Sequence, residues 1–89
     1  MKRGKLEIIR DILKIIKENK NYIKPTPLLR KSKVTSKRFK GYFSDMIEKG
    51  LIVETKTEDD NKFISLTDKG YQYLEKYNEL INFIDRFDL

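Results

Sequence analysis

The stretch from Lys24 to Gly50 constrains the fold most, because it contains two short helical patterns separated by a break of two residues. The first helix is predicted to begin at Thr26 as its N-cap, with Pro27 in the first turn, where helical N–H groups are unpaired anyway. The second is predicted to begin at Thr35 as its N-cap and to stop at Gly50. Two helices joined this closely form a helix-turn-helix.

Apolar residues recur at three- and four-residue spacing along the second helix, which predicts that they face the core. They are Phe39, Tyr42, Phe43, Met46 and Ile47. The opposite face is basic in its N-terminal half and acidic in its C-terminal half. In helix-turn-helix proteins the N-terminal end of this helix meets the bases, so the charge gradient has the sign that DNA requires. Gly41 lies on the outward face, where it either permits close approach to a ligand surface or has no role.

The 89-residue chain has a formal net charge of +6, and its positive charge is concentrated in the first half. Residues 1–44 contain 14 lysines and arginines against 3 acidic residues, whereas residues 45–89 contain 6 against 11. Between Lys20 and Lys40 there are eight basic residues and no acidic one. Such a cluster is typical of a polyanion-binding surface, and a merely solvated basic face is the alternative.

The composition also excludes several kinds of chemistry. Cysteine and histidine are absent, which removes disulfides, thiolate nucleophiles, the usual zinc sites and imidazole acid–base catalysis. Glu58, Asp59 and Asp60 lie in a predicted turn without a base or nucleophile nearby, so they are interpreted as solubilising. We therefore expect no enzyme activity, no cofactor and no metal site. Since no apolar run is long enough to span a bilayer and no signal peptide is evident, we expect a cytoplasmic protein with no membrane partner.

Lys5 to Asn19 is predicted to be an amphipathic helix. Its core-facing stripe consists of Leu6, Ile9, Leu13 and Ile16, widened by Ile8, Ile12 and Ile15. Ile8 and Ile15 lie more than about 100° from the centre of the stripe. They are therefore expected to contact a further element, either a C-terminal helix or a second chain, and packing under a loop is the alternative. A very short strand is expected at residues 22–24, just before Pro25.

Two β-type runs, residues 51–56 and 62–66, flank a segment rich in turn-forming residues and predict a β-hairpin. A hairpin directly after a helix-turn-helix is the wing of a winged-helix domain. Thr67 is then predicted to cap a final helix that runs to about Asp88.

The expected fold class is therefore α+β, a winged helix-turn-helix with three helices and a hairpin wing in residues 1–66. Residues 67–89 are expected to form a long amphipathic helix, about 33 Å at 1.5 Å per residue, packed on the same domain. Its apolar stripe consists of Gly70, Leu74, Tyr77, Ile81 and Ile84, with Tyr73, Leu80 and Phe87 alongside. The distal part is expected to be exposed in a monomer, where such a patch marks an interface, and folding back onto the first helix is the alternative. The predicted homodimer interface comprises Ile8, Ile15, Tyr73, Tyr77, Leu80, Ile81, Ile84 and Phe87.

Three segments carry a family resemblance. They are Lys24-Pro25-Thr26, then Ile47-Glu48-Lys49-Gly50-Leu51-Ile52, and Leu66-Thr67-Asp68-Lys69-Gly70 followed by Tyr73-Leu74-Glu75-Lys76-Tyr77. With them the chain resembles the small archaeal winged-helix DNA-binding proteins. The resemblance implies a role in transcription regulation or chromatin, and dimerisation through a C-terminal helix paired as an antiparallel coiled coil. It also implies that Ser36, Lys37, Arg38, Lys40 and Ser44 face the major groove.

The leading hypothesis is a homodimeric, sequence-selective protein that binds double-stranded DNA and regulates transcription, with residues 35–49 as the recognition helix in the major groove. The candidate DNA contacts are Thr35, Ser36, Lys37, Arg38, Lys40, Gly41 and Ser44 in this helix, with Lys24, Thr26, Arg30, Lys31, Lys33, Lys56 and Lys62 outside it. No small-molecule effector is predicted. The alternative is a winged helix used for protein–protein interaction without DNA binding, which the acidic wing tip favours.

Overall fold

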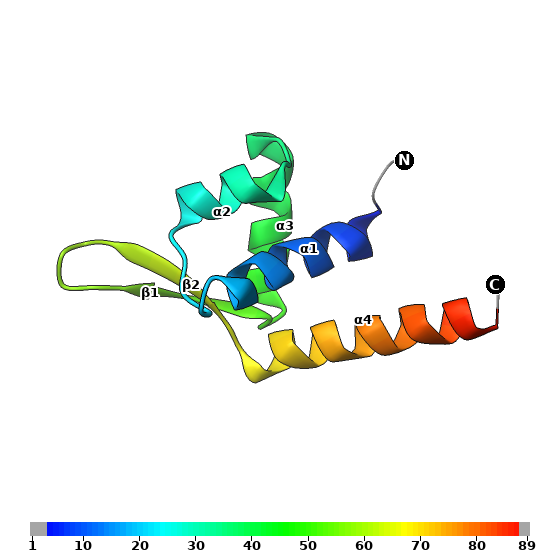
Figure 1. Cartoon of the computed structure of the whole chain (residues 1–89). Helices are drawn as coiled ribbons and strands as arrows, with labels where there is room; N and C mark the ends of the chain where they lie inside the picture. The colour runs from blue at the N-terminus through cyan, green and yellow to red at the C-terminus, as the bar shows by residue number, and fades with distance from the viewer. Residues whose placement is uncertain (1–3, 88–89) are drawn as a thin grey trace.

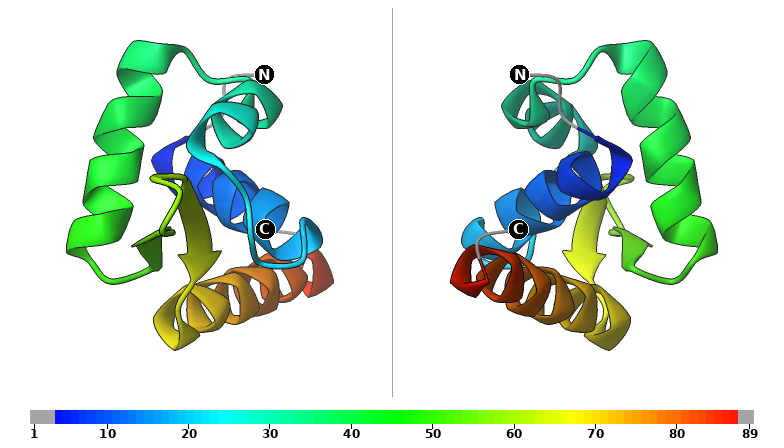
Figure 2. Two further views of the ribbon diagram at one scale, coloured as in Figure 1. Left: turned by 90° about the vertical axis from the view of Figure 1, so that its left-hand side faces the viewer. Right: turned by 90° about the vertical axis from the view of Figure 1, so that its right-hand side faces the viewer.

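The computed structural model describes residues 4–87 (Figure 1). The elements follow the order α1 (Lys5–Glu18), α2 (Pro25–Ser32), α3 (Ser36–Glu48), β1 (Ile52–Lys56), β2 (Lys62–Leu66) and α4 (Asp68–Arg86). The hairpin of β1 and β2 projects to one side of the helices, and α1 lies between the α2–α3 pair and α4 (Figures 1 and 2). This arrangement confirms the predicted α+β class, with three helices, a hairpin wing and a long C-terminal helix.

The helix starts follow the predicted caps in two of three places. The hydroxyl oxygens of Thr35 and Thr67 each accept a hydrogen bond from the backbone N–H three residues ahead. The predicted start of α2 is wrong: its N-cap is Lys24 and its first residue is Pro25. A proline at the first helical position gives up no hydrogen bond, so the helix begins there and Thr26 lies inside its first turn.

Each helix of the helix-turn-helix is followed by a residue with left-handed backbone. Gly50 ends α3 as predicted, with a φ of 74°. The N–H groups of Gly50 and Leu51 donate to the carbonyls of Ile47 and Met46 at 3.0 and 2.9 Å, which satisfies the last carbonyls of the helix. α2 ends at Lys33 with a φ of 58°, a conformation that lysine adopts less readily than glycine.

The hairpin is tied to the chain that precedes α2. The very short strand predicted at residues 22–24 is a single bridge, in which Ile23 and Ile64 exchange two backbone hydrogen bonds of 3.2 and 2.7 Å. The side-chain oxygen of Asn21 also accepts the N–H of Leu66 at 2.7 Å. These bonds hold the inner edge of β2 and fix the position of the wing relative to α2.

The hydrophobic core gathers around α1. Its buried members are Ile8, Ile9, Ile12, Leu13, Ile16, Ile23, Leu28, Phe39, Met46, Leu51, Ile52, Ile64, Leu66 and Leu74. Two residues predicted to be in the core lie outside it. Leu6 is 58% exposed because it sits in the first turn of α1, and Ile47 is 38% exposed because it lines a shallow surface hollow between α3 and β1.

α4 is attached through its N-terminal part, where Gly70 and Leu74 are buried. At Gly70 the helix approaches the Leu51 backbone so closely that any β-carbon would collide with the Leu51 carbonyl oxygen. Beyond this contact α4 runs past the start of α1 (Figure 1), and Leu80 and Phe87 are about half exposed, at 50% and 57%. Within residues 4–87, none of the helices has the length and apolar character needed to cross a membrane.

Candidate nucleic-acid interface

α3 turns a continuous exposed face outward. All the candidate contacts predicted in this helix are exposed, namely Thr35, Ser36, Lys37, Arg38, Lys40, Gly41 and Ser44. The opposite face is anchored by Phe39, which is only 6% exposed and stacks on Phe43 with ring centroids 5.7 Å apart. The buried aromatic side fixes the rotation of α3, so the basic N-terminal half is presented to solvent.

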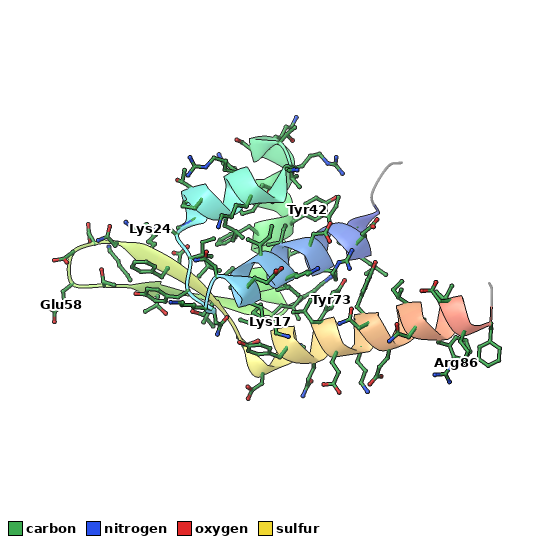
Figure 3. All side chains as sticks on the ribbon, in the orientation of Figure 1. Lys17, Lys24, Tyr42, Glu58, Tyr73 and Arg86 are labelled. Atoms are coloured by element: carbon green, nitrogen blue, oxygen red, sulfur yellow. The ribbon has the colours of Figure 1, made fainter. Side chains whose placement is uncertain are left out.

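Arg38 is held in place by its own helix. Its Nη2 atom donates a hydrogen bond of 3.2 Å to the Tyr42 hydroxyl, and its guanidinium carbon lies 5.9 Å from the centroid of the Tyr42 ring. Tyr42 lies between α3 and the start of α1 (Figure 3). Because the guanidinium carries several donors, this bond orients Arg38 while leaving N–H groups free for a ligand.

Sequence reasoning missed one cation at this surface. The Nζ atom of Lys5, at the start of α1, lies 3.2 Å from an Oδ2 atom of Asp45 in α3. Forty residues separate the two in the chain, so no local sequence pattern predicts the contact. Lys5 therefore places a positive charge from α1 beside the acidic group of Asp45 on α3.

Two of the candidate contacts outside α3 lie close to it. Thr26 and Lys62 meet Ser36 and Lys40 around a groove of about 490 Å³ between α2, α3 and the hairpin. Its floor is apolar, formed by Pro25, Leu29, Phe39 and Phe43.

Two other candidates, Lys31 and Lys33, lie on the α1 side of the domain. Lys31 and Lys33 line a separate hollow beside the C-terminal half of α1, and Lys31 donates to the Asn19 side chain at 3.3 Å. Lys24 lies over the Phe63 ring, with its Nζ atom 5.8 Å from the centroid, and Arg30 is exposed. The structure therefore gathers only part of the predicted contact set around α3.

The wing carries its own counter-charges. Lys56 lies 3.0 Å from a carboxylate oxygen of Asp60, and Lys62 lies 3.8 Å from one of Glu54. Glu58 is at the tip of the hairpin, far from α3 (Figure 3). Both lysines are exposed, and exposed pairs of this kind contribute little to stability.

The predicted dimer residues of α4 lie on one side of the helix. Tyr73, Tyr77 and Ile84 are half-buried, whereas Leu80, Ile81 and Phe87 are exposed. Sequence reasoning did not include Phe83, which is 53% exposed and packs on Phe87 with centroids 4.8 Å apart.

The two isoleucines of α1 that were assigned to the same interface behave differently. Ile8 is only 2% exposed because it belongs to the core of its own chain, so its assignment to a dimer interface is wrong. Ile15 is half-buried against that core. α1 therefore already has the further contact that its wide apolar face predicts, within one chain.

Comparison with known proteins agrees with this architecture. A family model described as winged helix-turn-helix matches residues 2–85. The crystal structure of Sso10a-2, a DNA-binding protein from Sulfolobus solfataricus, gives a TM-score of 0.76 at 20% identity, over 96% of this chain and 85% of that one. F93 from STIV, a winged-helix DNA-binding protein, gives 0.74 at 19% identity, over 90% of this chain and 91% of its own.

A third similar structure is larger than this chain. NadR in complex with 4-hydroxyphenylacetate gives a TM-score of 0.71 at 21% identity, over 96% of this chain and 58% of that one. No curated protein sequence matches significantly. Together the matches confirm the predicted winged-helix fold.

Proposed function

The chain belongs to the winged helix-turn-helix family, and on this premise we propose that it binds double-stranded DNA with α3 in the major groove. The observation that carries the proposal is the outward, basic N-terminal half of α3, held in position by the buried Phe39. Sso10a-2 and F93, which share the fold, are both described as DNA-binding proteins, and this supports the proposal.

The proposed contacts divide by chemistry. Lysines around the helix-turn-helix neutralise phosphates and set the affinity, because each releases condensed counterions from the duplex. The polar and charged side chains on the outward face of α3 read base edges and set the sequence preference. Lys37 lies in the first turn of α3 with its side chain exposed, so it is available to a duplex.

We further propose that the protein is a homodimeric transcription regulator. The exposed apolar side of distal α4, from Leu80 to Phe87, supports association of two chains. A two-fold axis then presents two α3 helices to one face of the duplex. They fit a palindromic site if they are about 34 Å, or a multiple of it, apart.

The test of DNA binding is the salt dependence of affinity for a fluorescent 20-base-pair duplex, measured by anisotropy. A dimer that neutralises about 6 to 8 phosphates gives a log–log slope of about −5 to −7. A slope near zero would contradict the proposal.

The role of α3 is tested with a charge reversal. Lys37→Glu should lower the affinity for duplex DNA at least tenfold without changing the thermal unfolding midpoint, because the side chain is exposed. Lys69→Glu is the matched control: it changes the net charge equally, but it lies in the first turn of α4, where an acidic residue is tolerated. Equal losses in the two variants would argue for a general charge effect and against α3 as the recognition helix.

A further inference from the structure

The outward face of α3 is interrupted by a notch of about 300 Å³ around Gly41, lined also by Lys5, Arg38, Tyr42 and Asp45. A β-carbon built at Gly41 meets no atom within 4 Å, so packing within the chain does not require glycine there. Glycine also weakens a helix interior relative to alanine. A position that disfavours the helix and serves no internal packing is best explained by a partner that approaches the backbone from outside.

The two ends of the notch carry opposite hydrogen-bonding groups. Arg38, oriented by the Tyr42 hydroxyl at 3.2 Å, offers N–H donors at one end. Asp45, one turn beyond Gly41, offers carboxylate acceptors at the other. The Lys5 ammonium at 3.2 Å offsets the charge of Asp45, which makes a carboxylate tolerable beside a polyanion.

A G·C base pair presents the complementary pattern in the major groove. Guanine exposes two acceptors, N7 and O6, which arginine meets in a bidentate manner, and cytosine exposes an amino donor that a carboxylate accepts. We propose that the Gly41 notch is the base-reading element of α3, in which Arg38 contacts guanine and Asp45 contacts cytosine, in one base pair or in neighbouring pairs. The inference rests on the proposed DNA binding and names the bases that α3 selects.

Gly41 has a steric role in this element. The groups that flank it reach their targets only if the helix backbone comes close to the base edges. A side chain at position 41 would stand between the helix and the groove floor. Lys5 is a positioning residue, because it acts on the bases only through Asp45.

The first experiment selects preferred sites from a randomised duplex library with the wild-type protein. A G·C pair is expected at the same position in each half-site. Gly41→Ala should raise the thermal unfolding midpoint by about 4–8 °C. The same variant should lose about tenfold or more in affinity for the selected site. Its affinity for a scrambled duplex should stay within about two-fold of the wild type, because the phosphate contacts are intact.

Two further variants separate the effect on base recognition from the effect on stability. Asn82→Ala, at an exposed position of α4, should also raise the midpoint while leaving the preference for the selected site unchanged. Asp45→Asn should shift the preference at one position away from cytosine by about fivefold or more, since an amide pairs best with adenine.

The outcomes distinguish this inference from the proposed function. A wild type without salt-dependent duplex binding defeats the proposed function itself. A wild type that binds DNA without a G·C preference overturns only the inference. A Gly41→Ala variant with unchanged affinity and an unchanged selected site also overturns only the inference.

Discussion

The hydroxyl of Tyr73 in α4 donates a hydrogen bond of 3.0 Å to the backbone carbonyl of Leu6 near the start of α1. One turn further along α4, the Arg10 guanidinium lies 5.0 Å from the centroid of the Tyr77 ring. Both contacts are made by the first half of α4. α1 packs in turn on α2 and the hairpin, so these contacts set the direction of α4 relative to the rest of the domain.

Removing the Tyr73 hydroxyl tests this coupling. Tyr73→Phe keeps the ring but removes the hydrogen bond to the Leu6 carbonyl, which should lower the free energy of unfolding by about 0.5–1.5 kcal/mol. Urea unfolding at neutral pH, followed by circular dichroism, measures the change. A variant as stable as the wild type would mean that water replaces the hydroxyl at no cost.

The same residue predicts a dependence on alkaline pH. Burial, and secondarily the neighbouring Tyr77, raise the pKa of Tyr73 above its ordinary value of 10.0. The folded state therefore keeps the Tyr73 proton to higher pH than the unfolded state. The contribution of the protonated hydroxyl to the free energy of unfolding is fully present below about pH 10 and is lost as the pH rises through the raised pKa. Urea midpoints between pH 9 and 11 should fall more steeply for the wild type than for Tyr73→Phe. Parallel curves would contradict the prediction.

Gly70→Ala should have the opposite effect on stability from Gly41→Ala. Alanine favours the helix at both positions, but at Gly70 its β-carbon would collide with the Leu51 carbonyl oxygen and crowd Leu66, whose Cδ2 atom lies 3.3 Å from the built position. Overpacking of this kind costs typically about 1–3 kcal/mol. Thermal unfolding of the two variants side by side checks the sign, and a stabilised Gly70→Ala would show that α4 shifts without cost.

How much of the structure the sequence predicts depends on the range of the interactions. The caps at Thr35 and Thr67 and the stop at Gly50 rest on bonds within a few residues, so residue type was sufficient. The Lys5–Asp45 pair depends on how α1 meets α3, and no local pattern encodes that. Ile8 shows the same limit: its apolar character predicted burial, but only the fold reveals that its own chain buries it.

Neutralising the wing tip should strengthen non-specific DNA binding. The change is Glu58→Gln with Asp59→Asn and Asp60→Asn. Each carboxylate near a phosphate costs on the order of 1 kcal/mol before salt screening, and Lys56 also loses its 3.0 Å partner Asp60 and becomes free.

The turn itself should survive these changes. Asp60 has a φ of 67°, and asparagine adopts this conformation as readily as aspartate. Anisotropy with a random duplex at low salt measures the gain, and circular dichroism monitors the fold. Weaker binding would show instead that the carboxylates hold the wing in its binding geometry.

The last prediction concerns assembly through the distal part of α4. Burying one large apolar side chain is worth about 1.5–3 kcal/mol, so four or five per chain, counted over two chains, exceed the entropic cost of association. Ile81→Asp combined with Ile84→Asp should therefore give monomers under conditions in which the wild type is dimeric. Sedimentation equilibrium of both proteins at tens of micromolar measures the difference.

The matched control places the same two charges on the polar side of the helix, as Gln72→Asp with Asn82→Asp, where both positions are exposed. This variant should remain dimeric, because it adds two negative charges without touching the apolar side. The dimeric control should also keep the steep salt dependence of duplex binding, whereas the monomeric isoleucine variant should show about half the slope, since one α3 instead of two then neutralises phosphates. A wild type that stays monomeric at this concentration would contradict the prediction and leave Leu80, Phe83 and Phe87 exposed to solvent in the isolated chain.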